Sequence, residues 1–185
     1  MKTKLKMLLA LLGLVMSSSY AEAEPTWPQK KATQSTMTMR DKLLAAKSNT
    51  FGIKTENDEQ VWAVIMDQGF DGGSLSLIAL QDGNASVYLS SGGGVIGGIA
   101  HPTVVAAAKN IVMSVNSMAG KFKHVKTFPL PSANQINFYA ISNSGVKSAT
   151  DSESALIEGT HPLNSVFYKG HYLLSELRKI SESRP

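Results

Sequence analysis

A run of glycines followed by a histidine is the first feature of this sequence whose spacing suggests chemistry. Gly92, Gly94 and Gly97 match the pattern G-x-G-x-x-G, in which glycine lets the main chain approach the pyrophosphate of a dinucleotide. A dinucleotide site also needs an acidic residue about 20 positions later. From Gly83 to Thr150 the chain contains no Asp or Glu, so we do not expect a dinucleotide.

The same glycines remain candidates for a simpler ligand, because a helix follows them and its N-terminus attracts anions. The candidate ligand or anion site comprises Gly92, Gly93, Gly94, Gly97, Gly98 and His101. A bulge or a tight bend of the main chain explains these glycines without any ligand.

Metal and nucleophile chemistry finds little support in the remaining residues. His161 and His171 are close enough in sequence to approach one another, but the chain has no H-x-x-x-H or H-E-x-x-H spacing and no Cys. It also lacks the nucleophile pattern G-x-S-x-G. We therefore predict no metal, no cofactor and no catalytic residue, although a Ser-His-Asp set assembled in space stays open because geometry defines it.

Acidic and basic residues are unevenly distributed along the chain. Asp67 and Asp71 flank the expected turn after the first strand, where aspartates usually bond their own backbone and only rarely act as paired carboxylates. The acidic residues before Gly83 are followed by a stretch with lysines and no acids. Two solvated faces explain this asymmetry, and a charge-complementary contact with a protein is the alternative.

The N-terminus has the three parts of a secretory signal peptide. Lys2, Lys4 and Lys6 precede an apolar run at residues 7–16, and Ala21-Glu22-Ala23 supplies small residues for cleavage. We predict a signal peptide over residues 1–23, cut after Ala23 or alternatively after Ala21. The apolar run is too short to span a bilayer, so we expect a periplasmic or secreted protein with no transmembrane span in its mature chain.

Composition and charge restrict the function of the remaining chain. With 185 residues, 43% hydrophobic and 17% charged, the sequence is typical of one globular domain. Cleavage removes three lysines and one glutamate, which lowers the formal net charge from +4 to +2. We therefore expect no nucleic-acid partner. The absence of cysteine suits an oxidising compartment.

An extended N-terminal arm over residues 24–37 is expected to precede the domain, which covers residues 38–185. Trp27 lies between Pro25 and Pro28 in this arm. It either packs on its own domain or serves as an aromatic anchor for a partner protein.

The hydrophobic pattern of the domain alternates between strand and helix periods. A capping box at Thr38 and Asp41 favours a helix over residues 39–47. Strands are expected at 61–66, 75–79, 86–89, 136–141 and 146–150, with longer helices over 104–122 and from about 162. The turn at Asp82 and Gly83 favours a hairpin. This order, α-β-β-β-α-β-β-α, predicts an α+β fold with a single, mostly antiparallel, five-stranded sheet covered by helices.

Two segments of the chain carry a resemblance to known proteins. The stretch from Val61 through the glycines at 92–98 and the closing His161-Pro162-Leu163 with Val166-Phe167-Tyr168 resemble a family of small bacterial proteins without assigned function. The element order is similar to that of profilin-like and roadblock-type domains. This similarity implies pairing with protein partners and transfers no site residue.

These observations favour an exported, non-enzymatic protein that acts through protein contacts as a subunit or adaptor of a bacterial cell-envelope assembly, such as a secretion system. A homodimer is compatible with this interpretation. The alternative is a periplasmic enzyme or a protein that binds a small ligand or anion through the Gly92–Gly98 loop and His101.

Overall fold

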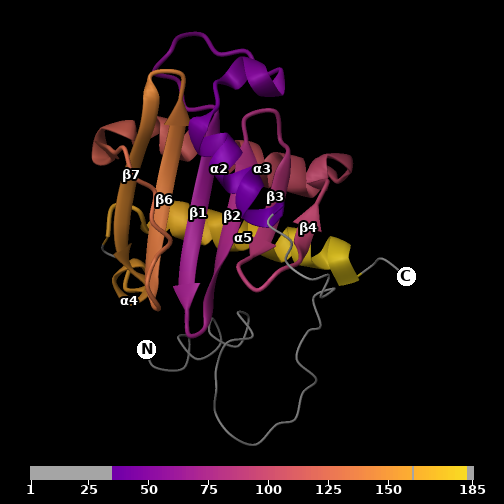
Figure 1. The fold of residues 1–185 in the computed structure, drawn as a ribbon, viewed down its shortest axis with the longest axis vertical. Coiled ribbons are helices and arrows are strands. Elements are labelled where there is room, and N and C mark those ends of the chain that lie inside the picture. The colour runs from indigo at the N-terminus through magenta and orange to yellow at the C-terminus, as the bar shows by residue number, and fades with distance from the viewer. Residues whose placement is uncertain (1–34, 160, 183–185) are drawn as a thin grey trace, which may run out of the picture.

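A seven-stranded antiparallel sheet forms the centre of the structure, a computed structural model that describes residues 35–159 and 161–182. The strand order is β4-β3-β2-β1-β6-β7-β5, as Figure 1 shows. The strands are β1 (Ala63–Phe70), β2 (Gly73–Leu80), β3 (Ala85–Leu89), β4 (Gly94–Ile96), β5 (Lys123–His124), β6 (Gln135–Ser142) and β7 (Gly145–Ser152). The predicted signal peptide and Trp27 lie outside the described residues.

Strand β1 is central, and its first residues are apolar on both faces. It pairs with β2 on one side and β6 on the other; the side chains of Ile65 and Met66, and of Trp62 just before the strand, are fully buried. The predicted hairpin between β2 and β3 is confirmed. Gly83 holds a φ of 99° in its turn, which glycine adopts without the steric penalty that a Cβ brings.

Helices cover both faces of the sheet, and Figure 1 shows α3 and α5 behind it and α2 in front. Helix α3 (Pro102–Ser117) starts with the proline that the sequence placed in its first turn. It packs beside α5 (Asn164–Glu182), and the two helices share a core with the inner face of the sheet. Helix α2 (Ser35–Ala45) buries Leu43 and Leu44 against the opposite face.

The remaining elements of the described residues are short. They are the 3-10 turns η1 (Ser48–Phe51), η2 (Gly98–Ala100) and η3 (Ala119–Lys121), and the short helix α4 (Glu153–Ile157). In the described part of the chain, no helix combines the length and apolarity that crossing a membrane requires.

The α+β class and the antiparallel sheet are confirmed, but the predicted number of five strands is wrong. The additional strands are β4 and β5, which contain three and two residues. Both are too short to show a strand period, and β4 also lies within the glycine run. Helix α3 ends at Ser117 rather than near Phe122, yet Phe122 is still buried, from the segment that follows the helix.

Candidate functional site

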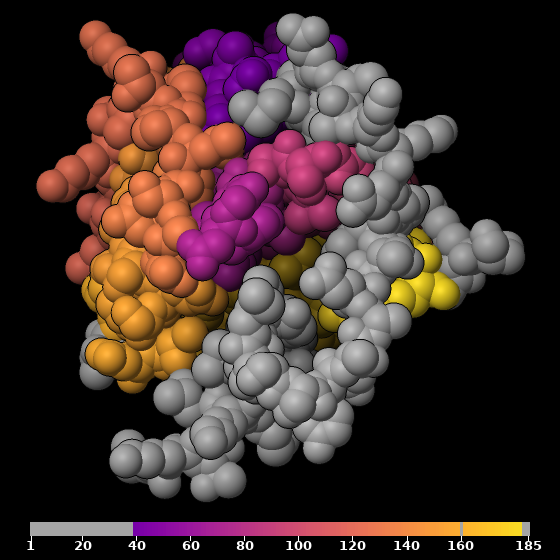
Figure 2. Space-filling model, turned by 60° about the horizontal axis from the view of Figure 1, so that its bottom comes forward, coloured from indigo at the N-terminus to yellow at the C-terminus, as the bar shows by residue number. Residues whose placement is uncertain are grey.

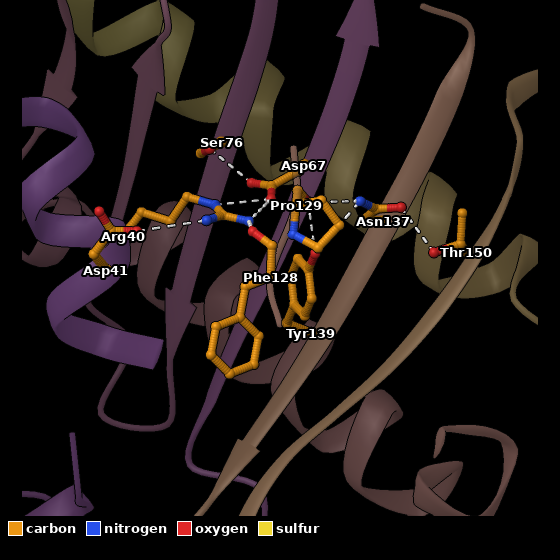
Figure 3. A network of polar contacts seen from close by, with 9 residues as sticks. All are labelled: Arg40, Asp41, Asp67, Ser76, Phe128, Pro129, Asn137, Tyr139 and Thr150. Atoms are coloured by element: carbon orange, nitrogen blue, oxygen red, sulfur yellow. Dashed lines mark hydrogen bonds and ion pairs between the residues drawn. The ribbon is translucent and has the colours of Figure 1, made fainter. Parts of the chain in front are cut away.

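The candidate site is a buried ion pair between α2 and the centre of the sheet (Figure 3). Asp67 lies within β1, not in the turn where the sequence analysis placed it, and its side chain is 0% exposed. Arg40 of α2 donates from Nε and Nη2 to Asp67 Oδ2 at 2.9 and 2.6 Å. The hydroxyl of Ser76, directly opposite on β2, donates to Oδ1 at 2.6 Å. Both carboxylate oxygens are therefore bonded.

The same guanidinium also reaches the segment between β5 and β6. Arg40 Nη2 donates to the carbonyl of Phe128 at 3.0 Å, and the guanidinium carbon lies 5.3 Å from the centre of the Tyr139 ring. The hydroxyl of Tyr139 donates to the carbonyl of Pro129 at 2.8 Å. Arg40 thus ties one helix, two strands and one loop together.

Asn137 on β6 extends the network toward the edge of the sheet. Its Nδ2 donates to the carbonyl of Pro129 at 3.0 Å, and its Oδ1 accepts from Thr150 Oγ1 on β7 at 2.7 Å. Figure 3 shows that these residues continue outward from the ion pair. The polar side chains of Asp67, Ser76, Asn137 and Tyr139 on this face of the sheet therefore all have hydrogen-bond partners within the chain.

Electrostatics in the network are governed by burial. Burial raises the pKa of Asp67, and the hydrogen bonds and charge of Arg40 oppose that rise. Burial, and then the negative charge of Asp67, raise the pKa of the Tyr139 hydroxyl. An adjacent cavity of about 10 Å³ is lined by Arg40, Ser74, Ser76, Tyr88, Leu89, Ser90 and Leu130. This volume matches a single water molecule.

The glycines of the predicted ligand loop divide between two turns on either side of β4. Gly92 and Gly93 lie in the turn from β3 to β4, and Gly94 is the first residue of β4; their φ values are 105°, 85° and 151°. A Cβ on Gly94 would lie 2.0 Å from the carbonyl oxygen of Val87, so glycine is required for this close strand pairing.

Gly97 and Gly98 belong to the second turn, which leads into α3. Gly97 has a φ of 91°, and a Cβ on Gly98 would lie 2.5 Å from Val104 Cγ1. His101 is the N-cap of α3, but its side chain makes no capping hydrogen bond. The six candidate residues therefore contribute to the β3–β4 turn and to the start of α3, not to one continuous loop.

A carboxylate of the chain itself lies at the beginning of α3. Glu176 of α5 is 6% exposed, and its Oε1 accepts a hydrogen bond from Lys179 Nζ at 2.5 Å. That bond is the main cause that lowers the pKa of Glu176, and a hydrogen bond with Thr103 in the first turn of α3 lowers it further. A negative charge near this helix end is favourable because of the helix dipole.

The two histidines considered for a metal lie in different surroundings. His161 uses both ring nitrogens, since Nε2 lies 2.6 Å from Asp151 Oδ2 and Nδ1 accepts from the Leu163 main-chain N–H at 3.1 Å. His171 has no hydrogen-bond partner on either nitrogen, and its ring lies 4.3 Å from that of Phe167. Among the residues that the structure describes, no group of three His, Cys, Asp or Glu side chains is arranged to hold a metal ion.

The fold and the network define an α+β protein in which a buried Arg–Asp pair joins a helix to the middle of a seven-stranded sheet. No protein-family model, curated protein or solved structure matches this chain.

Arg40, Ser76 and Tyr139 were not among the candidates from the sequence. One signal for a buried Asp67 was present in the sequence. If the strand continues beyond Ile65, its period of two residues puts Asp67 on the same face of the sheet as Ile65. An acid at such a position requires a buried partner. The sequence does not identify that partner, since Arg40 is 27 positions away on a separate helix.

Proposed function

We propose that this is an exported, non-enzymatic protein that acts as a subunit or adaptor of a cell-envelope assembly through contacts with other proteins. The proposal of export is based on the pattern of residues 1–23. The proposal of protein contacts is based on large apolar side chains at the surface, which the internal polar network does not use.

The observation that carries the proposal is the exposure of two large side chains on the helices α3 and α5. Met113 on α3 and Tyr172 on α5 are 63% and 55% exposed. Their helices are neighbours, and Lys169 Nζ of α5 donates to Ser114 Oγ of α3 at 2.5 Å between them. Met and Tyr are enriched in protein interfaces because they bury much area while tolerating partial exposure.

Most of the other exposed positions on α3 are small or uncharged. Ala106, Asn110 and Ser117 are exposed on the same helix as Met113. A surface with few charges loses little solvation free energy when a partner covers it. This composition supports a contact surface on the helix layer.

The test is a photo-crosslinking amino acid placed at Met113 or Tyr172 in the full-length protein and activated in intact cells. We expect each position to give a discrete adduct with a protein of the envelope, because the side chains there are covered in the assembly. Asn57, in the exposed loop before β1, is the control position and should give no adduct.

Equal yields at all three positions, or no adduct at Met113 and Tyr172, would contradict the proposed contacts. An adduct whose mass is twice that of the chain would assign the surface to a second copy of this protein.

Export is tested separately by the intact mass of the native protein. We expect a mature chain that begins at Glu24, because the signal pattern ends at Ala23. Fractionation of the same cells should place this chain outside the cytoplasm. A cytoplasmic protein that retains residues 1–23 would overturn both export and the envelope role.

A further inference from the structure

We propose that the sheet edge formed by β5 binds an extended acidic segment of a partner protein, which adds to the sheet as a strand. The edge segment is defined as residues 121–126. This inference rests on the proposed function and deepens it, since it gives the chemistry of one partner.

Two apolar side chains fix the edge segment to the domain. Phe122 is 6% exposed and packs in the core beneath α3, while Val125 packs against the core on the α2 side of the sheet. The Val125 main-chain N–H donates to the carbonyl of Val146 on β7 at 3.1 Å. The segment is therefore held at defined points, and binding it requires little ordering.

The side chains around these anchors are basic and exposed. Lys123 and His124 lie between the two anchors, and Lys121 and Lys126 flank them. Figure 2 shows long side chains that project at the left of the view from the part of the chain coloured for residues around 120. The three lysines have no ion-pair partner within residues 35–159 and 161–182.

Acidic residues of the chain do not compensate this charge. From Gly83 to Thr150 the sequence contains no Asp or Glu. Glu59, whose charge is close enough to interact with His124, already accepts a hydrogen bond from Lys147 at 2.9 Å. The edge therefore presents a local positive potential that attracts carboxylates.

The main chain of this edge is also available for pairing. β5 is the last strand of the sheet, and its pairing with β7 places Lys123 opposite Ser148 and His124 opposite Lys147. In an antiparallel ladder the main-chain groups of alternate residues point to opposite sides. Since the Val125 N–H bonds to Val146 of β7, the N–H and C=O of His124, one position earlier, point outward, away from β7.

The combination of exposed lysines with outward main-chain groups at this edge favours an acidic polypeptide over other polyanions. A lipid surface or a nucleic acid uses the lysines alone, whereas an extended segment also uses the outward main-chain groups. Lysines on an edge repel a second copy of the same edge, which limits self-pairing. A strand with alternating Glu or Asp is attracted by the same charges.

The experiment titrates the isotopically labelled full-length protein with a short, end-capped peptide in which Glu alternates with Thr. We expect the amide signal of His124 to shift strongly, because its N–H gains an acceptor. A matched peptide with Lys in place of Glu should not bind. Vesicles of phosphatidylglycerol test charge without a peptide backbone.

Three variants separate the contributions. Lys121→Gln/Lys123→Gln/Lys126→Gln should bind the acidic peptide about tenfold more weakly and with less dependence on salt, because exposed ion pairs contribute modestly and additively. His124→Pro removes the outward N–H without breaking the ladder with β7, and should weaken binding about three- to tenfold while the salt dependence remains. Lys109→Gln, an exposed lysine on α3, is the control and should bind like the wild type.

Several results would overturn the proposal. They are an unshifted His124 amide, equal affinity of His124→Pro and the wild type, or binding of the vesicles without binding of the peptide. The His124 shift is read in the wild-type protein, so the test holds even where the proline variant folds poorly. Crosslinking at Met113 and Tyr172 is independent of this edge, so the two proposals can fail separately.

Discussion

Replacement of Arg40 with methionine is expected to lower the free energy of unfolding by about 3–5 kcal/mol, the usual effect of leaving one partner of a buried ion pair alone. Methionine keeps the aliphatic part of the side chain but leaves Asp67 with Ser76 as its only described hydrogen-bond donor. The carbonyl of Phe128 also loses its bond to Arg40. Urea denaturation of the wild type and Arg40→Met at pH 7 measures the difference.

An exposed pair of similar length provides the control for this prediction. Arg178 and Glu182 of α5 are 2.7 Å apart with side chains 37% and 59% exposed. Arg178→Met should change stability by no more than about 0.5 kcal/mol, because water already solvates both groups. The double variant Arg40→Met/Asp67→Leu should be more stable than Arg40→Met, since it buries no unpaired charge. Equal effects of Arg40→Met and Arg178→Met would contradict the structural role of the network.

Acidification should destabilise the protein through His171. Burial lowers the pKa of this histidine from 6.5 to about 4. The unfolded chain therefore takes up a proton near pH 6.5, whereas the folded protein does so only near pH 4. The stability that neutral His171 provides is fully present above pH 6.5 and is lost as the pH falls toward 4, by about 3 kcal/mol in total.

The prediction is tested by urea denaturation at pH 7 and pH 4.5. His171→Leu has a similar volume and no titratable group, so it should lose about 2–3 kcal/mol less than the wild type between these two pH values. The control is Phe167→Leu, which alters packing against the same ring. It should lower stability by a similar amount at both pH values. If the wild type and His171→Leu showed the same pH dependence, the histidine would not be the cause.

The parts of the fold that were predictable depend on local patterns. The Asp82-Gly83 turn predicted the β2–β3 hairpin, and Pro102 predicted the start of α3, because each rests on the conformation of one or two residues. The apolar run from Val61 predicted the central strand, since a strand buried on both faces needs no polar residue.

The parts that were missed depend on distant contacts. A polar residue after an apolar run normally ends a strand, so Asp67 was assigned to a turn, but Arg40 and Ser76 make its burial favourable. Strand β5 was missed because its two residues pair with β7, which follows more than twenty positions later. The edge position of Lys121, Lys123 and Lys126 was missed for the same reason, because it depends on the pairing of β5 with the distant β7.

The central ladder between β1 and β6 has a consequence for the order of folding. Strands β1 to β4 form a meander in which each strand pairs with the next one along the chain, and β6 pairs with β7 through a short turn. The β1–β6 ladder joins these two local units by pairing Ala63 with Ile141, across a segment that includes α3. Closing that long loop is the largest entropic step in forming the sheet. We therefore infer that the meander and the hairpin form early, and that joining them along β1 limits the rate of folding.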